Sequence, residues 1–253
     1  MLAAPRSGAE NMARDTALLA RAARTGETVF SVYSWERPTL SFGRNQAALG
    51  LYDVDKIRAS GLSVVRRPTG GRAILHDREV TYSVTAPLDG APPLREAYTR
   101  INNILIEGLA RLGVSTELAA SGARAPAPTD RPCFETPTQG ELVAQGRKLV
   151  GSAQWRDEKG LLQHGSILVD DDQSSLPSFA ANAVVNNPTI PAPATLTDLL
   201  GRVPAPADVA NALFEAVRNA EDPDAEELSE DEIRGEALEL VPMYLDENWT
   251  WRR

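Results

Sequence analysis

Two segments of the chain combine glycines with charged side chains at spacings that could bind a ligand. The first segment reads Arg66-Arg67-Pro68-Thr69-Gly70-Gly71-Arg72, and it predicts a hairpin: a strand, a tight turn and a returning strand. Adjacent glycines permit positive φ angles and leave backbone N–H groups unobstructed, so the turn could contact a carboxyl or phosphate group. Arg66, Arg67 and Arg72 would supply positive charge beside it. The same residues also fit an ordinary hairpin with a charged rim.

The second segment reads Lys148-Leu149-Val150-Gly151-Ser152-Ala153-Gln154, and His164-Gly165-Ser166 follows it. Both stretches predict strands, with small residues where a ligand could pass close to the backbone. Lys148 is the only charge that enters this run of apolar and small residues. It is therefore a candidate functional ammonium, although most lysines at such turns simply face water.

The chain has two histidines, His76 and His164, and each lies in one of these segments. No cluster of acidic residues or cysteines stands at metal-ligand spacing around them, so we expect no metal site. The sequence places neither histidine as a general base. We expect His76 to form a structural hydrogen-bonded pair with Asp77, and His164 to pack beside the bound ligand.

Cys133 is the only cysteine, and it follows a proline-rich stretch at 121–132 that predicts a surface loop. A lone cysteine is most often a small buried hydrophobic residue, but its position outside an apolar run also fits a nucleophile. A thiol attacks efficiently only when it is ionised, and a nearby ammonium favours the thiolate. Lys148 is the best candidate for that ammonium. One cysteine cannot form an intrachain disulfide, which indicates a reducing, intracellular setting.

Apolar periodicity predicts the elements that would position these residues. A first helix is expected to be capped by Asn11 and to end at Thr25-Gly26, and further helices are expected at 54–59, 94–112 and 206–220. A last helix is expected to begin at a Ser229–Glu232 capping box and to run toward Tyr244. Strands are expected at 28–35, 39–42, 63–67, 80–85, 141–144, 148–153 and 161–168, the last three as a meander. Residues 170–194 predict an extended surface connection. Strands in hairpins with helices at the start, middle and end are typical of an α+β fold, a mixed β-sheet flanked by helices.

Length, charge and hydropathy narrow the possible classes. The 253 residues predict a single domain, with the motifs at about 10–170 and a helical, acidic part at about 195–253. A formal charge of −9 argues against nucleic acid as the main partner. The segment 208–247 holds fourteen acidic residues against two arginines, whereas residues 66–72, the double-glycine segment, are basic. No signal peptide or apolar run of about eighteen residues is present, so we expect a cytoplasmic protein without a membrane span.

The two segments resemble the RRxTGGxAxxHD and KxxGSAQ…HG motifs of the lipoate-protein ligase and octanoyltransferase family. Residues 10–15 and 38–46 are also similar to that family, and the resemblance covers most of residues 10–170. The runs Cys133-Phe134-Glu135 and Glu141-Leu142-Val143 resemble the cysteine-dependent octanoyl-[acyl carrier protein]:protein N-octanoyltransferases of the ligase-like type, which carry their nucleophile at this position. The resemblance implies a biotin/lipoate protein ligase-like catalytic domain.

The resemblance further implies an enzyme that moves an octanoyl group from acyl carrier protein to a lysine of lipoyl domains. The acceptors would be 2-oxoacid dehydrogenase complexes or the glycine cleavage H protein, and the reaction would need no cofactor. Cys133 would carry the acyl group as a thioester and Lys148 would assist it. The expected substrate-binding residues are Arg66, Arg67, Thr69, Gly70, Gly71, Arg72, His76, Gly151, Ser152, Ala153, His164 and Gly165.

Three alternatives stay open at this point. They are an ATP-dependent lipoate-protein ligase, an octanoyl amidotransferase acting between lipoyl-domain proteins, and a non-catalytic acyl-binding adaptor. For the transferase, we expect the acidic carrier protein to dock on a basic face. That face would be formed by Arg66, Arg67, Arg72, Arg78 and Arg147.

Overall fold

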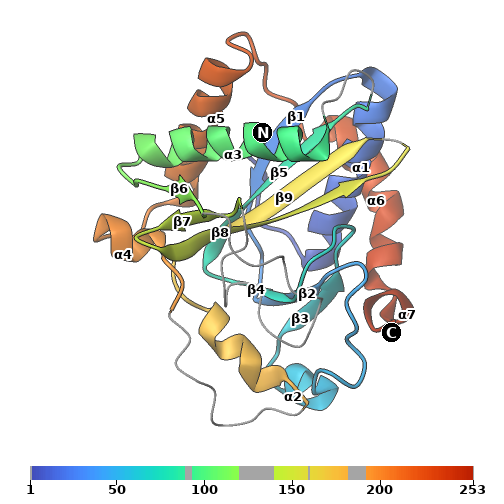
Figure 1. The fold of residues 1–253 in the computed structure, drawn as a ribbon. Helices are drawn as coiled ribbons and strands as arrows, with labels where there is room; N and C mark the ends of the chain where they lie inside the picture. Colours follow the sequence, from blue (N-terminus) through green and yellow to red (C-terminus); the bar gives the residue numbers. More distant parts are fainter. Residues whose placement is uncertain (1, 89–92, 120–139, 159, 182–191, 253) are drawn as a thin grey trace.

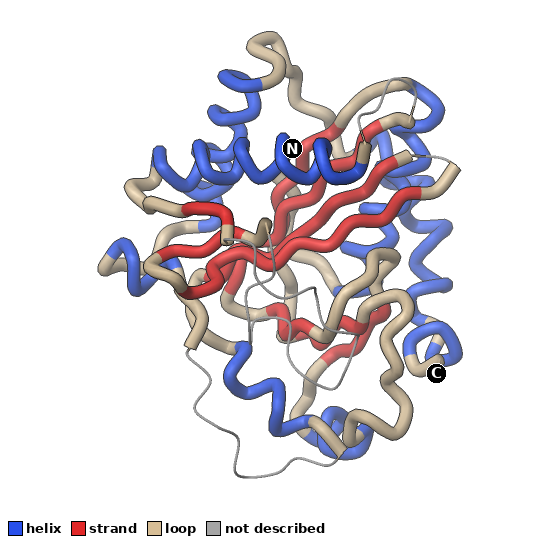
Figure 2. The backbone as a smooth tube through the Cα atoms, in the orientation of Figure 1, coloured by secondary structure: helices blue, strands red, loops and turns tan. Residues whose placement is uncertain are grey.

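The computed structural model describes residues 2–88, 93–119, 140–158, 160–181 and 192–252. Cys133 and the loop expected at 121–132 lie outside the described residues. Two β-sheets form the centre of the molecule, and helices pack around them (Figures 1 and 2). None of the described helices is long and apolar enough to cross a lipid bilayer.

The larger sheet has six strands, and every neighbouring pair in it is antiparallel. Its strands, in spatial order, are β1 (Val29–Tyr33), β5 (Glu79–Ala86), β9 (Leu161–Leu168), β8 (Arg147–Arg156), β7 (Leu142–Ala144) and β6 (Glu117–Leu118). The predicted meander is confirmed, because β7, β8 and β9 are consecutive neighbours. All eight residues of β9 are buried, so this central strand is covered on both faces.

Helices cover the two faces of the larger sheet (Figure 1). On one face α3 (Leu94–Arg111) and α5 (Pro206–Ala220) pack against an apolar side of the strands, where Tyr82 and Val84 lie. On the other face lies α1 (Gly8–Thr25), and α6 (Asp231–Leu245) packs along it. Helix α1 faces the polar side of the strands, which carries hydroxyl and imidazole groups. Part of this polar side lines the candidate site described below.

The start of α1 differs from the prediction. Its N-cap is Ser7, whose hydroxyl accepts from the Glu10 amide while Glu10 accepts from the Ser7 amide, a capping box. Asn11 is not a cap: it is buried inside the helix, where its side-chain amide donates to the Ser34 carbonyl at 3.2 Å. The predicted end at Thr25 and Gly26 is confirmed, with Gly26 in the left-handed conformation that ends many helices.

The smaller sheet corrects the predicted hairpin. Strand β2 (Thr39–Phe42) lies in the middle, β3 (Ser63–Arg66) pairs with it in parallel, and β4 (Ile74–His76) pairs with it antiparallel. The double-glycine segment therefore crosses the end of β2 instead of closing a hairpin between β3 and β4. Helix α2 (Val54–Ala59) supplies the crossover that a parallel pair needs. The sheets together are mixed and flanked by helices, as predicted.

The region after β9 is less irregular than predicted. A 3₁₀ helix, η1 (Gln173–Phe179), packs on the smaller sheet, where Leu176 is buried. The Gln173 side chain pairs with both backbone groups of Leu75. Two further short helices are α4 (Leu196–Leu200) and α7 (Glu247–Thr250). The prediction of an extended surface connection is therefore wrong for 173–179, and residues 182–191 of it lie outside the described part of the chain.

Candidate active site

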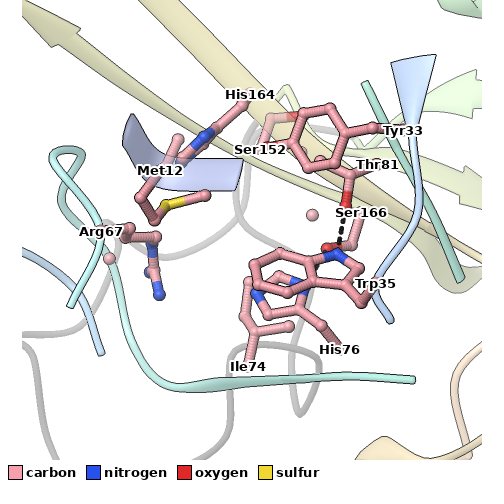
Figure 3. Close-up of a pocket in the computed structure, with 14 residues that line it drawn as sticks. Met12, Tyr33, Trp35, Arg67, Ile74, His76, Thr81, Ser152, His164 and Ser166 are labelled. Carbon is pink, nitrogen blue, oxygen red and sulfur yellow. Dashed lines mark hydrogen bonds between the residues drawn. The ribbon is translucent and has the colours of Figure 1, made fainter. Parts of the chain in front are cut away.

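A pocket lies between the polar side of the larger sheet and the double-glycine segment (Figure 3). Its walls surround about 390 Å³ of space between atoms, part of which is open to solvent. Its lining residues are Met12, Tyr33, Trp35, Arg67, Gly71, Ile74, His76, Thr81, Gly151, Ser152, Ala153, His164, Gly165 and Ser166. Apolar atoms make up most of the exposed lining, because the polar groups of the lining residues are largely buried in hydrogen bonds with one another and with the backbone. Such a pocket fits an apolar chain with one polar end.

His164 joins three separate elements at the pocket wall. Its Nδ1 lies 2.8 Å from Oδ2 of Asp15 on α1, and its Nε2 lies 2.6 Å from the hydroxyl of Thr69 in the double-glycine segment. Asp15 also accepts a hydrogen bond from the Tyr33 hydroxyl at 3.0 Å. Burial and the neighbouring Asp15 carboxylate raise the pKa of Tyr33 well above its usual value. His164 itself lines the pocket, and its contact with a ligand stays a prediction.

His76 has an acidic partner that differs from the predicted one. Its Nδ1 lies 3.1 Å from Oε1 of Glu79, whereas Asp77 is exposed, so the predicted His76–Asp77 pair is wrong. The reason is geometric: the turn after β4 points Asp77 outward and β5 returns Glu79 inward. Burial raises the pKa of Glu79, but the charge of His76 and hydrogen bonds from His76, Ser166 and Thr81 outweigh it and hold that pKa below its usual value.

Trp35 covers His76 and forms part of the pocket floor. Figure 3 shows the two rings stacked on each other. Their centroids lie 3.9 Å apart and their planes differ by 15°. The indole N–H donates to the Glu79 carboxylate and to the Thr81 hydroxyl, both at 2.9 Å. The indole is therefore fixed in orientation, and its apolar faces are left for packing.

The double-glycine segment is built around the guanidinium of Arg67. This group donates to the carbonyls of Gly70 and Arg72 at 2.8 and 2.7 Å, and to the Ser41 carbonyl at 3.1 Å. Gly71 has a φ of 97°, a conformation that favours glycine. The segment packs directly on Gly43, the residue after β2. A Cβ at that position would lie 2.1 Å from the Gly71 carbonyl oxygen, so only glycine fits there. Arg67 thus shapes the segment from inside.

The predicted basic docking face is wrong for three of its five arginines. Arg66, Arg67 and Arg72 are buried. The Arg66 guanidinium donates to backbone carbonyls at the end of the chain and after β2, which fastens α7 to the smaller sheet. Arg78 and Arg147 do reach the surface, but they pair with Asp170 and Asp198. Arginines next to glycines in a motif can be buried, because one guanidinium can donate to several backbone carbonyls.

Lys148 is buried and forms an ion pair that the sequence did not indicate. Its Nζ lies 2.7 Å from Oε1 of Glu141, with side-chain exposures of 1% and 8%. Both side chains interact with further groups as well. Lys148 does not line the pocket. Strand β8 places it on the side of the sheet that also carries Ser152, whose hydroxyl lies 2.7 Å from the Tyr82 hydroxyl.

The structure brings together most of the predicted site residues. Arg67, Gly71, His76, Gly151, Ser152, Ala153, His164 and Gly165 line the pocket. Thr69 does not line the pocket itself but is hydrogen-bonded to His164, which does. The predicted site residues that are not part of the lining are Arg66, Gly70, Arg72 and Lys148. Cys133 cannot be placed, because it lies outside the described residues.

Sequence reasoning missed the carboxylates that hold these side chains. They are Asp15, Glu79 and Glu141, and none lies at a spacing that points to its partner. It also missed the pocket residues Met12, Tyr33, Trp35, Ile74, Thr81 and Ser166. Trp35 offered one signal, a tryptophan at a strand end, which often needs a hydrogen-bond partner. In the described part of the chain, no three histidine, cysteine or acidic side chains are grouped so that they could hold a metal ion.

Known proteins share both this fold and this sequence pattern. The family model of the lipoyl protein ligase A/B catalytic domain matches residues 7–218. Octanoyltransferase LipM from Kyrpidia tusciae is 38% identical over 264 residues, which cover 98% of this chain and 96% of that one. Octanoyltransferase LipM from Carboxydothermus hydrogenoformans is 42% identical over 67% of this chain, a match that spans 64% of the relative, just under two thirds of its length.

Solved structures agree on the fold. A chain from the structure of a bi-partite lipoate protein ligase and its E2 lipoyl domain from Thermoplasma acidophilum superposes with a TM-score of 0.77 at 20% identity, covering 99% of this chain and 94% of that chain. Lipoate-protein ligase A bound with ATP gives a TM-score of 0.77 at 20% identity, with coverage of 99% and 97%. At such identity these neighbours bear on the fold alone. The match of the family model and of the full-length relative, on the other hand, shows that this chain belongs to the lipoyl protein ligase A/B catalytic domain family.

Proposed function

We propose that the protein is an octanoyltransferase that moves an octanoyl group from acyl carrier protein to a lysine of lipoyl domains. The observation that carries the proposal is the similarity to an octanoyltransferase over nearly the whole length of both chains. The pocket supports it, because a mostly apolar exposed lining suits a medium acyl chain. We also propose that residues 1–253 act as one catalytic domain, since α6 packs along α1 and α5 along α3.

The proposed reaction has two steps, with Cys133 as nucleophile. The Cys133 thiolate attacks the thioester carbonyl of the donor; a new carbon–sulfur bond forms, the old one breaks, and the carrier thiol leaves with a proton. The amine of the acceptor lysine then attacks the acyl-enzyme, forms the amide and releases the Cys133 thiol. A thioester and an amine give an amide and a thiol, so the chemistry consumes no ATP. The acceptors we propose are lipoyl domains of 2-oxoacid dehydrogenase complexes or the glycine cleavage H protein.

The roles proposed for the other residues follow their positions. Gly71 lines the pocket, and its amide donates to no other described residue, which leaves a backbone N–H to meet the acyl carbonyl. Gly151, Ala153 and Gly165 keep the wall thin where the chain would lie. Lys148 would favour the thiolate or orient the carbonyl, with Glu141 fixing its ammonium.

The test is the intact mass of the protein after incubation with octanoyl-acyl carrier protein and no ATP. The wild-type protein should gain the mass of one octanoyl group, and hydroxylamine should remove it. Cys133→Ser should gain nothing, because a hydroxyl without an adjacent base is far less nucleophilic. Addition of a lipoyl domain should then transfer the group from the wild-type acyl-enzyme to the domain.

Two other outcomes would overturn the proposal. If acylation of the lipoyl domain requires ATP and a free acid, and Cys133→Ser retains it, the protein is a ligase, the activity of its solved neighbours. If neither condition modifies the protein or the lipoyl domain, it is an acyl-binding adaptor on a catalytic fold.

A further inference from the structure

The side chains of Asp15, His164 and Thr69 form a hydrogen-bonded chain that no motif predicted. The Asp15 and Thr69 side chains are fully buried and His164 is 5% exposed. The two bonds that His164 makes, at 2.8 Å and 2.6 Å, use both nitrogens of its ring. Figure 3 shows the ring at the pocket edge, across from the stacked rings of Trp35 and His76. A ring with both nitrogens engaged has no freedom to rotate.

The hydrogen positions can be assigned from the partners. The oxygen of Asp15 that contacts His164 also accepts from the Tyr33 hydroxyl, so it acts as an acceptor toward both groups. Nδ1 of His164 therefore carries a hydrogen, and in the neutral ring Nε2 accepts from the Thr69 hydroxyl. Asp15 thereby selects the form of the ring that can hold Thr69.

This chain of bonds connects the two sheets across the pocket. His164 belongs to β9 of the larger sheet, whereas Thr69 follows β3 of the smaller sheet and directly precedes the two glycines. On its other side, the double-glycine segment is held to the smaller sheet by Arg67 and by the Arg44 amide, which donates to the Thr69 carbonyl at 2.7 Å. The His164–Thr69 bond thus holds the segment close to β9, and both contribute residues to the pocket lining, Gly71 from the segment and His164 from β9.

We propose that Asp15 and Thr69 are positioning residues, which act through His164 to hold the double-glycine segment at the separation that admits the acyl chain. The proposal rests on the proposed octanoyl transfer for its kinetic test. Because neither residue lines the pocket, their loss should weaken binding of the acyl donor rather than slow the chemical step. The expected signature is a rise in KM with little change in kcat.

The kinetic experiment compares two threonine substitutions at one position with a matched change elsewhere. Thr69→Val removes the hydroxyl and leaves Nε2 of His164 buried without it, so we expect KM for octanoyl-acyl carrier protein to rise about tenfold or more. Thr69→Ser restores the hydroxyl and should recover most of that loss. Thr85→Val is the control, since the Thr85 hydroxyl is also buried but has no hydrogen-bond partner among the described residues. A fall in kcat at constant KM, or equal effects of Thr69→Val and Thr85→Val, would overturn the proposal.

A second readout does not depend on activity. The chain has two histidines, so protein labelled with ¹⁵N at histidine shows two rings, and His76→Gln identifies the signals of His164. In the wild type, His164 should show one fixed form with hydrogen on Nδ1. Asp15→Asn should move the Nδ1 signal and Thr69→Val the Nε2 signal, while Thr85→Val moves neither. Unchanged signals in all three variants would refute the hydrogen-bonded chain, even if the wild type transfers octanoyl groups. If the wild type transfers none, the proposed function fails and the ring signals still decide whether Asp15 and Thr69 hold His164.

Discussion

The contribution of the buried Lys148–Glu141 ion pair to protein stability can be measured without knowing the substrate. Substituting Glu141 by glutamine keeps the size of the side chain and an acceptor oxygen, but it removes the negative charge 2.7 Å from the Lys148 ammonium. At an effective dielectric constant of about 20, two unit charges at that distance attract by about 6 kcal/mol. Part of this attraction only offsets the cost of burying both charges, and measured losses on breaking a buried pair are about 3–5 kcal/mol. We expect the lower end, about 3 kcal/mol, because the glutamine oxygen can still accept a hydrogen bond.

The assay is urea unfolding followed by circular dichroism. With a denaturant slope of about 2–3 kcal/mol per M for a domain of this size, a loss of about 3 kcal/mol lowers the midpoint by about 1 M urea. Both side chains also interact with other groups, so a double-mutant cycle with Lys148→Met is needed to isolate the pair. The double variant buries neither charge, and its loss should fall at least about 2 kcal/mol short of the sum of the single losses.

An exposed pair on the same protein serves as the control. Arg58 and Glu247 lie 3.0 Å apart with side-chain exposures of 59% and 73%, so Glu247→Gln should change the unfolding free energy by less than about 1 kcal/mol. If Glu141→Gln behaves like Glu247→Gln, or if the losses of Glu141→Gln and Lys148→Met simply add, the two buried charges do not stabilise each other. The reasoning about Glu141 as the group that fixes Lys148 would then be refuted.

Two further predictions concern Asp172 and Gly165. Burial raises the pKa of Asp172 from 3.8 to about 6, although hydrogen bonds from Arg78 and Gln173 act to lower it. Because the pKa is higher in the folded state, the protonated side chain stabilises the fold fully below about pH 4, and this stabilisation is lost as the pH rises through 6. Asp172→Asn should therefore raise the unfolding free energy at pH 7 by about 1–2 kcal/mol but not at pH 4, and an equal gain at both pH values in urea unfolding would contradict this reading. A Cβ on Gly165 would lie 2.5 Å from the Gly151 carbonyl oxygen, so Gly165→Ala should lower the unfolding free energy by about 1–3 kcal/mol and slow octanoylation. Gly235 has open space around it in a helix, so Gly235→Ala should stabilise the protein slightly. Similar urea midpoints for the two variants would count against a tight pocket wall.

Local signals in the sequence were sufficient for many elements. Strands β2 and β9 and helices α2 and α5 have the predicted bounds, because their signals lie within the elements themselves. Helix α5 begins at Pro206, in the first-turn position that proline favours, and β2 begins with the β-branched Thr39 and ends with the aromatic Phe42. The overlooked cap of α1 was also local, since Ser7 and Glu10 have the spacing of a capping box.

Strand pairing could not be obtained in the same way. The residues of β3 and β4 are separated by a turn that looks like a hairpin, and nothing local shows that β2 will lie between them. Helix α2 carries the chain from β2 back to the start of β3, so β3 runs parallel to β2, and β4 pairs with the other edge of β2. In this arrangement Leu40 and Phe42 of β2 are buried in a common core. Pairing is a tertiary outcome, so the hairpin prediction had only a weak basis.

The same distinction separates the site residues that were found from those that were missed. The pocket residues that the sequence identified lie in two compact motifs, because a ligand that meets the backbone needs neighbouring small residues in one strand or turn. The groups that hold them come from elsewhere: Asp15 is 149 positions from His164, and Glu141 meets Lys148 across a strand pair. Such partners need only reach the motif side chain in space, and a buried histidine or lysine forces some partner to exist without naming it. A motif histidine or lysine in an apolar stretch is thus evidence for an unseen carboxylate, and here that inference would have held for His76, His164 and Lys148 alike.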